Sequence, residues 1–449
     1  MRPKKGDQLE LTIDSLAYGG AGVARRDRYV VFVAGGLPGD RVLAEVGKAK
    51  SRFAEARIVE LLEPSPDRVP ERAPHPGASW QCLKYERQLV EKQQQVYDSL
   101  QRLGGFEQPP VEEIVPADED HRWNYRNKVE YSFGAGEDGK LALGYHLPGR
   151  WDVIEDVDDV VLASQNANEV RRLVRDWCDD AGLTPYDRRE KNGFLRNLFV
   201  REGRRTGHTM VRLVTTAGEF ADGEFGAFAH EFATSTIWTQ TEDRGDAAAN
   251  GTSKTLAGIP FIEEELCGLR FRISPDAFFQ TNTEQAEKLY GVAREFADLH
   301  GHERVFDLYC GSGTIGLSMA VRAAGIWGIE INETAVKDAK TNARINEIDN
   351  AQFVAGDMRL ALPELLGKVG KPDVVVVDPP RAGMSQKVVR RILEAEAKRI
   401  VYVSCNPSTL APNLRQMVDA GYELKRVRPV DMFPHTPHIE AVAVLDRVS

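Results

Sequence analysis

The sequence predicts an α/β protein with a doubly wound parallel sheet at its carboxyl end, a small β-barrel at its amino end and a β-rich region between them. From residue 267 to residue 449, short apolar strands alternate with helical segments, which is typical of βαβ units. Residues 1–64 show two-residue alternation broken by glycine pairs, which is typical of a small barrel. In residues 70–266 two hairpin patterns indicate a β-rich central domain. We expect these three ranges to be the domains.

The composition is that of a soluble globular chain. Its 449 residues are 42% hydrophobic and 28% charged, and a length of this size predicts two or three domains. The apolar runs are all much shorter than the roughly 18 residues that cross a membrane. The opening residues, "MRPKKGDQLEL", are basic but have no apolar stretch behind them, unlike a secretory signal. We therefore expect a cytoplasmic protein without a membrane partner.

The charge distribution and the cysteine spacing bear on whether the protein binds nucleic acid, forms disulfides or holds a metal ion. The formal net charge is −10, yet residues 1–60 hold 11 lysines and arginines against 8 aspartates and glutamates. Binding of phosphates depends on a local basic face, so the overall charge does not exclude a nucleic acid as partner. The cysteines are scattered without a C-x-x-C spacing, which argues against disulfides and against a metal site; they are Cys82, Cys178, Cys267, Cys310 and Cys405.

The amino-terminal barrel carries a candidate RNA-binding rim. Lys48, Lys50 and Arg52 offer contacts to phosphates, and Phe53 offers a ring on which a base can stack. The alternative is an ordinary solvated rim. This stretch resembles a TRAM domain, an oligonucleotide-binding type of barrel found at the front of several RNA-modifying enzymes. The proline-rich segment "EPSPDRVPERAPHPG" then reads as a linker, and a helix is expected near residues 84–103, packed on the catalytic domain.

A cofactor site is expected at the first strand of the carboxyl-terminal sheet. The segment "VFDLYCGSGTIGLSMA" is a strand, a glycine turn and a helix start, where backbone N–H groups and close approach favour a ligand. It lacks the spacing of a dinucleotide fingerprint and of a phosphate-binding loop. Glu330 and Asp357 follow the next two strands, where carboxylates suit ribose hydroxyls and an adenine amino group. Helix capping is the alternative for both carboxylates. This order resembles the Rossmann-like fold of S-adenosylmethionine-dependent methyltransferases.

The later strands carry the chemistry. The fourth strand ends in "DPPRAGM", with Arg381 where amine-methylating enzymes have an aromatic residue. The fifth strand ends at Cys405, before an Asn-Pro turn and a helix start that would stabilise a thiolate. A buried, inert cysteine is the alternative. Glu440 heads an apolar strand, where burial would raise its pKa toward that of a useful base.

A thiol and a carboxylate are the two groups needed to methylate carbon 5 of a pyrimidine. A thiolate adds to carbon 6, which makes carbon 5 nucleophilic, and a base later removes the proton from carbon 5. The target base must leave its stack to reach the thiol. Cys405 and Glu440 fit these two roles.

The motifs "DPPRAGM", "YVSCNPSTL" and "DMFPHTPHIEAV" resemble, in this order, the signatures of the RNA uracil-5-methyltransferase family. The resemblance implies that Cys405 is the nucleophile, that Glu440 is the base and that S-adenosyl-L-methionine is the cofactor. Asp378 would also orient the uracil. The implied cofactor contacts are Gln280, Tyr309, Thr314, Glu330, Asp357 and Asp378, and the implied substrate contacts are Arg126, Asn127, Lys128, Asp378 and Arg381.

The chain departs from the family in one respect. Several members hold an iron–sulfur cluster through four cysteines, but here His75, Ala78 and Asp159 stand at three of those positions. Cys82 alone cannot hold a cluster. We expect none, and we expect a monomer.

Three questions stay open at this point. The barrel favours 23S ribosomal RNA over the uridine-54 type of transfer-RNA substrate, although archaeal transfer-RNA enzymes blur that rule. A cytosine-5 RNA methyltransferase uses similar thiol chemistry, but the pairing of the "SCNP" motif with Glu440 favours uracil. A non-catalytic RNA-binding relic is the third alternative.

Overall fold

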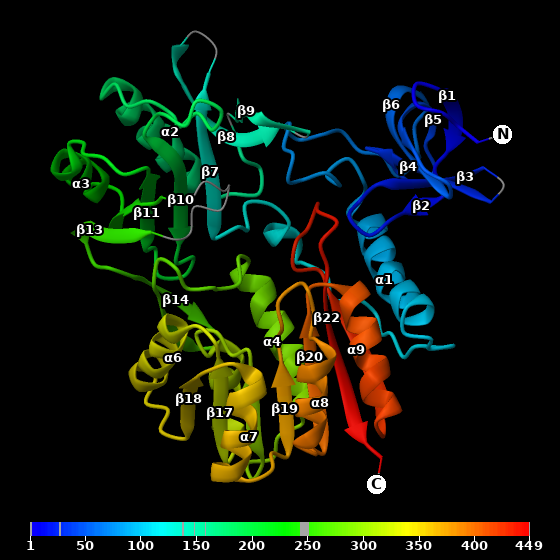
Figure 1. Ribbon diagram of the computed structural model, residues 1–449, viewed down its shortest axis with the longest axis vertical. Coiled ribbons are helices and arrows are strands. Elements are labelled where there is room, and N and C mark those ends of the chain that lie inside the picture. The colour runs from blue at the N-terminus through cyan, green and yellow to red at the C-terminus, as the bar shows by residue number, and fades with distance from the viewer. Residues whose placement is uncertain are drawn as a thin grey trace.

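The structure, a computed structural model, describes residues 2–26, 28–136, 139–147, 149–157, 159–242 and 251–448. Three lobes follow one another along the chain, and Figure 1 shows the barrel in blue, the central domain in teal and green, and the catalytic domain in yellow to red. The predicted α/β fold class is confirmed, with a barrel, a β-rich centre and a doubly wound sheet. No helix in the described part of the chain is long and apolar enough to cross a membrane.

The barrel is a single curled sheet with the strand order β1-β5-β6-β4-β3-β2. Side chains alternate along β1, where Leu9 and Leu11 point inward and their neighbours are exposed. These inward side chains form a small core together with Val31 and Val42. The strands are Gln8–Thr12 (β1), Ser15–Leu16 (β2), Gly22–Arg26 (β3), Tyr29–Ala34 (β4), Arg41–Ala49 (β5) and Phe53–Glu63 (β6).

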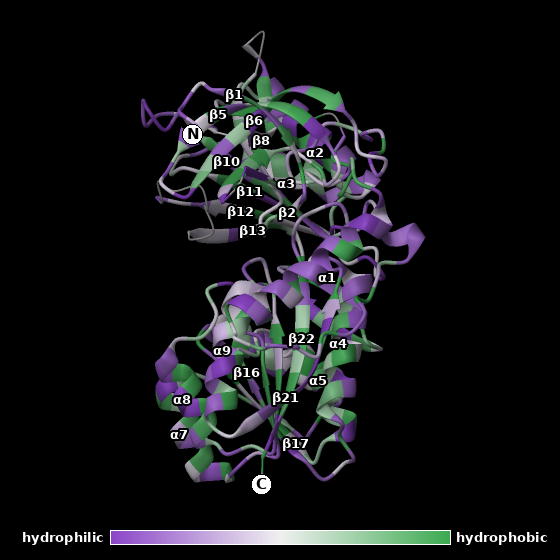
Figure 2. Cartoon of the chain, turned by 90° about the vertical axis from the view of Figure 1, so that its right-hand side faces the viewer, coloured by the Kyte–Doolittle hydropathy of each residue, from purple (hydrophilic) through white to green (hydrophobic). Residues whose placement is uncertain are grey.

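The central domain is a sheet with the order β13-β12-β11-β10-β7-β8-β9. Its core lies between the sheet and the helices α2 and α3, which cover one face of it (Figures 1 and 2). The opposite face carries polar side chains, which leaves it suited to contacts outside the domain. The elements are β7 (Lys128–Ala135), β8 (Leu141–Leu147), β9 (Arg150–Asp156), α2 (Gln165–Asp180), β10 (Leu195–Glu202), β11 (Thr209–Thr215), α3 (Asp222–His230), β12 (Ser235–Gln240) and β13 (Thr252–Gly258), preceded by the short helix η1 (Glu119–His121).

The catalytic sheet has the order β18-β17-β16-β19-β20-β22-β21, in which β22 runs antiparallel to its neighbours. Strands buried on both faces need continuous apolar sequence, and β19 is four valines, all buried. Its elements are α4 (Thr283–Ala297), β16 (Arg304–Leu308), α5 (Thr314–Met319), η3 (Ala320–Arg322), β17 (Gly325–Glu330), α6 (Glu333–Ile345), β18 (Ala351–Ala355), α7 (Met358–Val369), β19 (Val374–Val377), α8 (Gln386–Glu394), β20 (Arg399–Ser404), α9 (Pro407–Asp419), β21 (Tyr422–Val430) and β22 (Glu440–Arg447), with the hairpin β14 (Ile262–Leu266) and β15 (Leu269–Ile273) before them.

Helices cover both faces of this sheet. One core joins α4, α5 and α6 to the sheet, and a second joins α7, α8 and α9 to the other face. The helix α1 (Tyr85–Arg102) packs beside α9 in this second core, through Val96 and Leu100, although it precedes the central domain in the chain (Figure 1). The catalytic domain is therefore completed by a helix from the amino-terminal part of the chain.

A buried ion pair ties α1 to the catalytic sheet. Lys92 of α1 lies 2.5 Å from Asp431 at the end of β21, and both side chains are 0% exposed. Asp431 also accepts a hydrogen bond from the Tyr85 hydroxyl at 2.7 Å, and Lys92 donates to the Phe433 carbonyl at 2.9 Å. The main-chain N–H of His435 donates to the Gln88 side chain. The segment that leads from β21 to Glu440 is thus held by α1.

We expect the substitution Lys92→Met to lower the free energy of unfolding by about 3–5 kcal/mol, because it leaves the Asp431 carboxylate buried without its partner. Urea denaturation followed by tryptophan fluorescence measures the change. The matched control is Lys84→Met, which removes an exposed pair with Asp67 and should cost less than about 1 kcal/mol. Equal small losses in the two variants would show that the pair contributes nothing beyond a surface contact.

Candidate functional site

The predicted site residues line up along one edge of the catalytic sheet. Parallel strands present their carboxyl ends at the same edge, and the strand order reverses between β16 and β19, where ligands of doubly wound sheets bind. In the order of the strands across the sheet, the residues are Asp357 after β18, Glu330 at the end of β17, Tyr309 after β16, Asp378 after β19, Cys405 after β20 and Glu440 at the start of β22.

The glycine turn after β16 is open toward this edge. Gly311 and Gly313 have positive φ angles of 52° and 82°, which favour glycine over other residues. A Cβ atom at Gly311 would meet nothing within 4 Å, so a ligand can come close to this backbone. Glu330 accepts hydrogen bonds from the N–H groups of Gly311, at 3.2 Å, and Asn332, at 2.9 Å, which fixes the direction of its carboxylate.

The other candidate cofactor contacts surround this turn. Thr314 begins α5 and shares a hydrogen bond of 3.0 Å with the Tyr290 hydroxyl. Tyr309 has a φ of 63°, an uncommon backbone conformation for a residue with a side chain. Gln280 is buried and precedes α4. Asp357 caps α7 and pairs with Arg359, which holds the pKa of Asp357 down at about 2. Its capping role is therefore real, and an adenine contact would have to share the carboxylate.

Cys405 lies beside carboxylates. The register of β20 and β22 pairs Ser404 with Ala441, so the next pair toward the catalytic edge is Cys405 and Glu440. Burial, together with the charges of Glu440 and Asp378, raises the pKa of the Cys405 thiol to about 12, while Arg381 acts in the opposite direction. This differs from the expectation that the start of α9 stabilises a thiolate. The helix terminus is outweighed because the thiol is half-buried and because Glu440 and Asp378 oppose the formation of another negative charge beside them.

Three carboxylates of the catalytic domain, Asp307, Asp378 and Glu440, have raised pKa values. Burial and the charge of Asp307 raise the pKa of Asp378 to about 7. Burial raises the pKa of Glu440, which is 4% exposed, well above that of an ordinary glutamate, as the sequence predicted. The pKa of Asp307 is also about 7, chiefly because of burial. Asp378 and Asp307 therefore change protonation near neutral pH, which suits proton transfer.

Two arginines influence the neighbouring His438. Arg381 is exposed, and its carbonyl accepts a hydrogen bond of 3.0 Å from the side chain of Asn406 next to Cys405. Arg126 lies over the Phe433 ring at 5.7 Å. Both guanidinium groups lower the pKa of His438, which burial brings down to about 4. The central and catalytic domains thus each bring one arginine to His438, which is neutral at physiological pH.

The predicted substrate residues Asn127 and Lys128 have different surroundings. Asn127 is 4% exposed, and its side chain donates to the Gln280 carbonyl and to Thr283, each at 2.9 Å. It therefore holds the segment that carries Gln280 and does not face outward. The reason is that residue 127 lies where the central domain joins the catalytic domain. Lys128 lies on the polar face of the central sheet, where burial and Arg201 lower its pKa to about 8.

Sequence reasoning gave no role to His438 or to Asp307. Both stand inside recognised segments, His438 two residues before Glu440 and Asp307 within β16. Asp307 is 1% exposed, and no described residue donates a hydrogen bond to its Oδ1 atom. A carboxylate in the middle of an apolar strand is the signal that could have identified Asp307. His438 offered no such signal, because its environment is built by three separate parts of the chain.

The segment that replaces the cluster-binding region is filled by protein side chains. Ala78 is fully buried and packs with Tyr125. His75 accepts a hydrogen bond from its own turn, and burial lowers its pKa to about 4. Cys82 is half-buried and Asp159 is exposed. Among the described residues no group of three or more potential ligands could hold a metal ion. That the protein carries no cluster stays a prediction.

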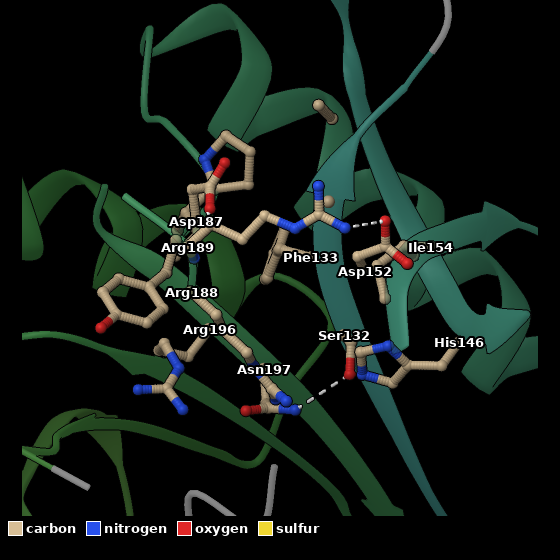
Figure 3. Close-up of a pocket in the computed structure, with 15 residues that line it drawn as sticks. Ser132, Phe133, His146, Asp152, Ile154, Asp187, Arg188, Arg189, Arg196 and Asn197 are labelled. Atoms are coloured by element: carbon tan, nitrogen blue, oxygen red, sulfur yellow. Dashed lines mark hydrogen bonds and ion pairs between the residues drawn. The ribbon is translucent and has the colours of Figure 1, made fainter. Parts of the chain in front are cut away.

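A polar cavity of about 370 Å³ lies on the central domain, on the face of the sheet opposite to α2 and α3. Figure 3 shows Arg188, Arg189 and Arg196 around it, with Asn197 from β10. Arg189 pairs with an aspartate at 2.6 Å, and the Arg196 guanidinium lies 4.6 Å from the Tyr186 ring. An aromatic ring and guanidinium groups suit contacts with bases and phosphates.

Comparison with known proteins agrees with this geometry. Residues 261–448 match the family model of tRNA (uracil-5-)-methyltransferases, and residues 2–59 match the TRAM domain. An uncharacterized RNA methyltransferase of Halalkalibacterium halodurans is 38% identical over 98% of this chain and 97% of its own length. A second, from Chlorobaculum tepidum, is 38% identical over 100% of this chain and 98% of its own.

A solved structure is similar to this chain over nearly all of its length. It is the tRNA (uracil-54, C5)-methyltransferase of Pyrococcus abyssi in complex with S-adenosyl-L-homocysteine, with a TM-score of 0.81 and 30% identity, covering 97% of this chain and 99% of that one. A doubly wound sheet with a glycine turn and acidic strand ends defines a methyltransferase that uses S-adenosyl-L-methionine. The chain belongs to the RNA uracil-5-methyltransferase family, with an RNA-binding TRAM domain at its amino end.

We expect alkylation of Cys405 by iodoacetamide to rise with pH up to at least about pH 10, because the thiol ionises far above an ordinary cysteine. Mass spectrometry of the Cys405 peptide follows the rate. Glu440→Gln should speed alkylation at about pH 9 by roughly three- to tenfold, since it removes the largest charge that opposes the thiolate. A rate that levels off below about pH 8 in the unaltered enzyme would contradict this account.

Proposed function

We propose that this enzyme transfers a methyl group from S-adenosyl-L-methionine to carbon 5 of a specific uridine in structured RNA, by covalent addition of Cys405. The observation that carries the proposal is the placement of Cys405 directly after β20 and of Glu440 at the start of the adjacent strand β22, with Asp378 directly after the neighbouring strand β19. One nucleophile and one buried base therefore lie at the same edge of the sheet, and carbon-5 methylation requires these two groups.

The residues act in a fixed order. The Cys405 thiol releases its proton to solvent and the sulfur adds to carbon 6, which turns carbon 5 into a nucleophile. Carbon 5 would then take the methyl group, with S-adenosyl-L-homocysteine as the leaving group. Glu440 then removes the proton from carbon 5, and breakage of the carbon–sulfur bond restores the ring and frees the thiolate. Asp378 orients the uracil as a hydrogen-bonding partner beside Cys405. Its pKa of about 7 lets it bind the base in either protonation state near neutral pH.

The cofactor supplies the methyl group as a sulfonium, whose positive charge also favours the thiolate and the carboxylates. Glu330 would hold the ribose, and the open backbone at Gly311 would allow close approach. The Oδ1 atom of Asp307, which accepts no hydrogen bond from the part of the chain that the structure describes, supports a polar ligand near this turn. Tyr309, Thr314, Gln280 and Asp357 complete the proposed contacts.

The RNA is proposed to lie across the barrel, the polar face of the central sheet and the catalytic edge. β7 runs from Lys128, next to the catalytic domain, toward Ser132 at the arginine-lined cavity. At about 3.3 Å per residue these two positions are about 13 Å apart, a span of two or three nucleotides. Arg126 and Arg381 then lie where the target nucleotide enters.

We propose 23S ribosomal RNA as the substrate, supported by the TRAM barrel in front of the catalytic domain. Transfer RNA is the second candidate, favoured by likeness over the full chain to the Pyrococcus abyssi enzyme, whose substrate is uridine 54 of transfer RNA. A cytosine-5 enzyme is less well supported, because a base such as Glu440 serves uracil chemistry. We further propose a cytoplasmic monomer.

The test is incubation of the protein with tritiated S-adenosyl-L-methionine and unmodified 23S or transfer RNA, followed by nucleoside analysis. We expect labelled 5-methyluridine in one of the two RNAs and a loss of at least about 1,000-fold with Cys405→Ala, since the covalent route is removed. Labelled 5-methylcytidine would show that the protein is a cytosine-5 RNA methyltransferase instead. Binding without any label would favour a relic.

The variant Glu440→Gln tests the later step, in which the proton is removed from carbon 5 and Cys405 is released. Without the base, the methylated adduct keeps its proton at carbon 5 and cannot release Cys405. We therefore expect a covalent protein–RNA species that survives denaturing electrophoresis, and none when Cys405→Ala is combined with it. Normal turnover by Glu440→Gln would exclude Glu440 as the base.

Arg196→Ala tests the proposed RNA path. We expect RNA binding to weaken and its salt dependence, as the slope of log affinity against log salt, to fall by about 1, because one phosphate contact is lost. Filter binding at several salt concentrations measures both. Lys371→Ala is the control. Lys371 precedes β19, at the edge of the catalytic sheet opposite to the site, and pairs with Glu396. An Arg196→Ala slope equal to the control would exclude this cavity from the RNA path.

A further inference from the structure

A turn of the barrel is docked against the catalytic half of the molecule. We name residues 17–21, between β2 and β3, the barrel turn. The Ala17 carbonyl accepts a hydrogen bond of 3.4 Å from Gln95 of α1, and the N–H of Leu16, just before the turn, donates to Glu91 of α1 at 3.2 Å. Figure 1 shows β2 directly above α1. The barrel turn is therefore attached to the helix that completes the catalytic domain.

The same turn touches the segment that leads to Glu440. The Trp80 ring donates to the Gly20 carbonyl at 3.4 Å. A Cβ atom at Gly20 would lie 3.0 Å from Trp80 and 3.1 Å from Pro437, so the backbone of the turn packs closely against both residues and a side chain here would require them to shift. Pro437 precedes Glu440 by three residues. The close fit places the barrel turn at the rim of the proposed target site.

One side chain of the turn reaches Arg381. The Tyr18 hydroxyl accepts a hydrogen bond of 3.3 Å from the Arg381 guanidinium, whose central carbon lies 5.9 Å from the Tyr18 ring centroid. On its other side, the Arg381 backbone accepts a hydrogen bond from Asn406, the neighbour of Cys405. Arg381 is thus connected to the barrel through its side chain and to the nucleophile's loop through its main chain.

We infer that Tyr18 is a positioning residue of the target-uridine site: it holds the Arg381 guanidinium beside Cys405, so that the barrel contributes to the chemical step in addition to binding RNA. The inference rests on the proposed function, in which Cys405 is the nucleophile. Arg381 is exposed and has a long flexible side chain, so without a partner its charge would spread over many positions in solvent.

The consequence concerns the reactivity of the thiol. The charge of Arg381 lowers the pKa of Cys405 against the effects of burial, Glu440 and Asp378. A guanidinium held near the sulfur favours the thiolate, and a guanidinium released into solvent favours it less. Loss of the Tyr18 hydroxyl should therefore slow reactions of Cys405 even when RNA is absent.

The experiment compares alkylation of Cys405 by iodoacetamide, without RNA, in the full-length unaltered protein and in Tyr18→Phe, Arg381→Ala and the double variant. Because the contact is partly exposed, we expect Tyr18→Phe to slow alkylation at about pH 9 by about two- to fivefold. Arg381→Ala should slow it at least as much. Adding Tyr18→Phe to Arg381→Ala should have no further effect, since both act through one group.

The matched control is Tyr29→Phe. It removes a hydroxyl from the same barrel, where Tyr29 donates to the carbonyls of Lys50 and Phe53, and it should leave alkylation of Cys405 unchanged. With RNA, Tyr18→Phe should lower kcat by a similar factor to alkylation. A Tyr18→Phe variant that raises only KM for RNA, with alkylation as in the unaltered protein, would overturn the inference, as would additive effects in the double variant. The proposed function fails separately, if Cys405→Ala still makes 5-methyluridine.

Discussion

The buried ion pair between Lys92 and Asp431 is the interaction on which the arrangement of the site depends. A charge without its partner in such a place is costly, so α1 and the end of β21 have one favourable relative position. The segment after Asp431 contains His435, whose ring stacks on Trp123 at 3.6 Å, and ends at Glu440. The base of the proposed reaction is therefore positioned by a helix more than 300 residues away in sequence.

The same constraint brings the barrel to the site. The α1 face that carries Lys92 also carries Glu91 and Gln95, which bind the backbone at the barrel turn. Buried polar groups on a helix are stabilised by hydrogen-bond partners, and the barrel supplies the Leu16 N–H for Glu91 and the Ala17 carbonyl for Gln95. The same face of α1 therefore contacts both the barrel, which carries Tyr18, and the segment that leads to Glu440. This explains why an RNA-binding barrel at the amino end can reach a thiol near the carboxyl end.

Electrostatics at the site favour protonated groups in the free enzyme. The Cys405 thiol lies near the carboxyl groups of Asp378 and Glu440, and a negative charge on one of these groups makes it less favourable to ionise the others. Positive charge changes this balance, whether it comes from Arg381 or from the sulfonium of the cofactor. A thiol that stays protonated until the site is filled is protected from side reactions such as oxidation, which proceed through the thiolate.

The sequence by itself determined the fold class, the order of the domains and the identity of the two groups proposed for catalysis. Short-range patterns carry this information, because each of them spans only a few neighbouring residues. They are the four valines of β19, the glycine turn at Gly311 and the residues around Cys405 and Glu440. The tertiary structure decided the buried role of Asn127, the raised pKa of Cys405 and the contact between Tyr18 and Arg381. These properties depend on solvent exclusion and on charges from distant segments, which become neighbours only when the domains pack.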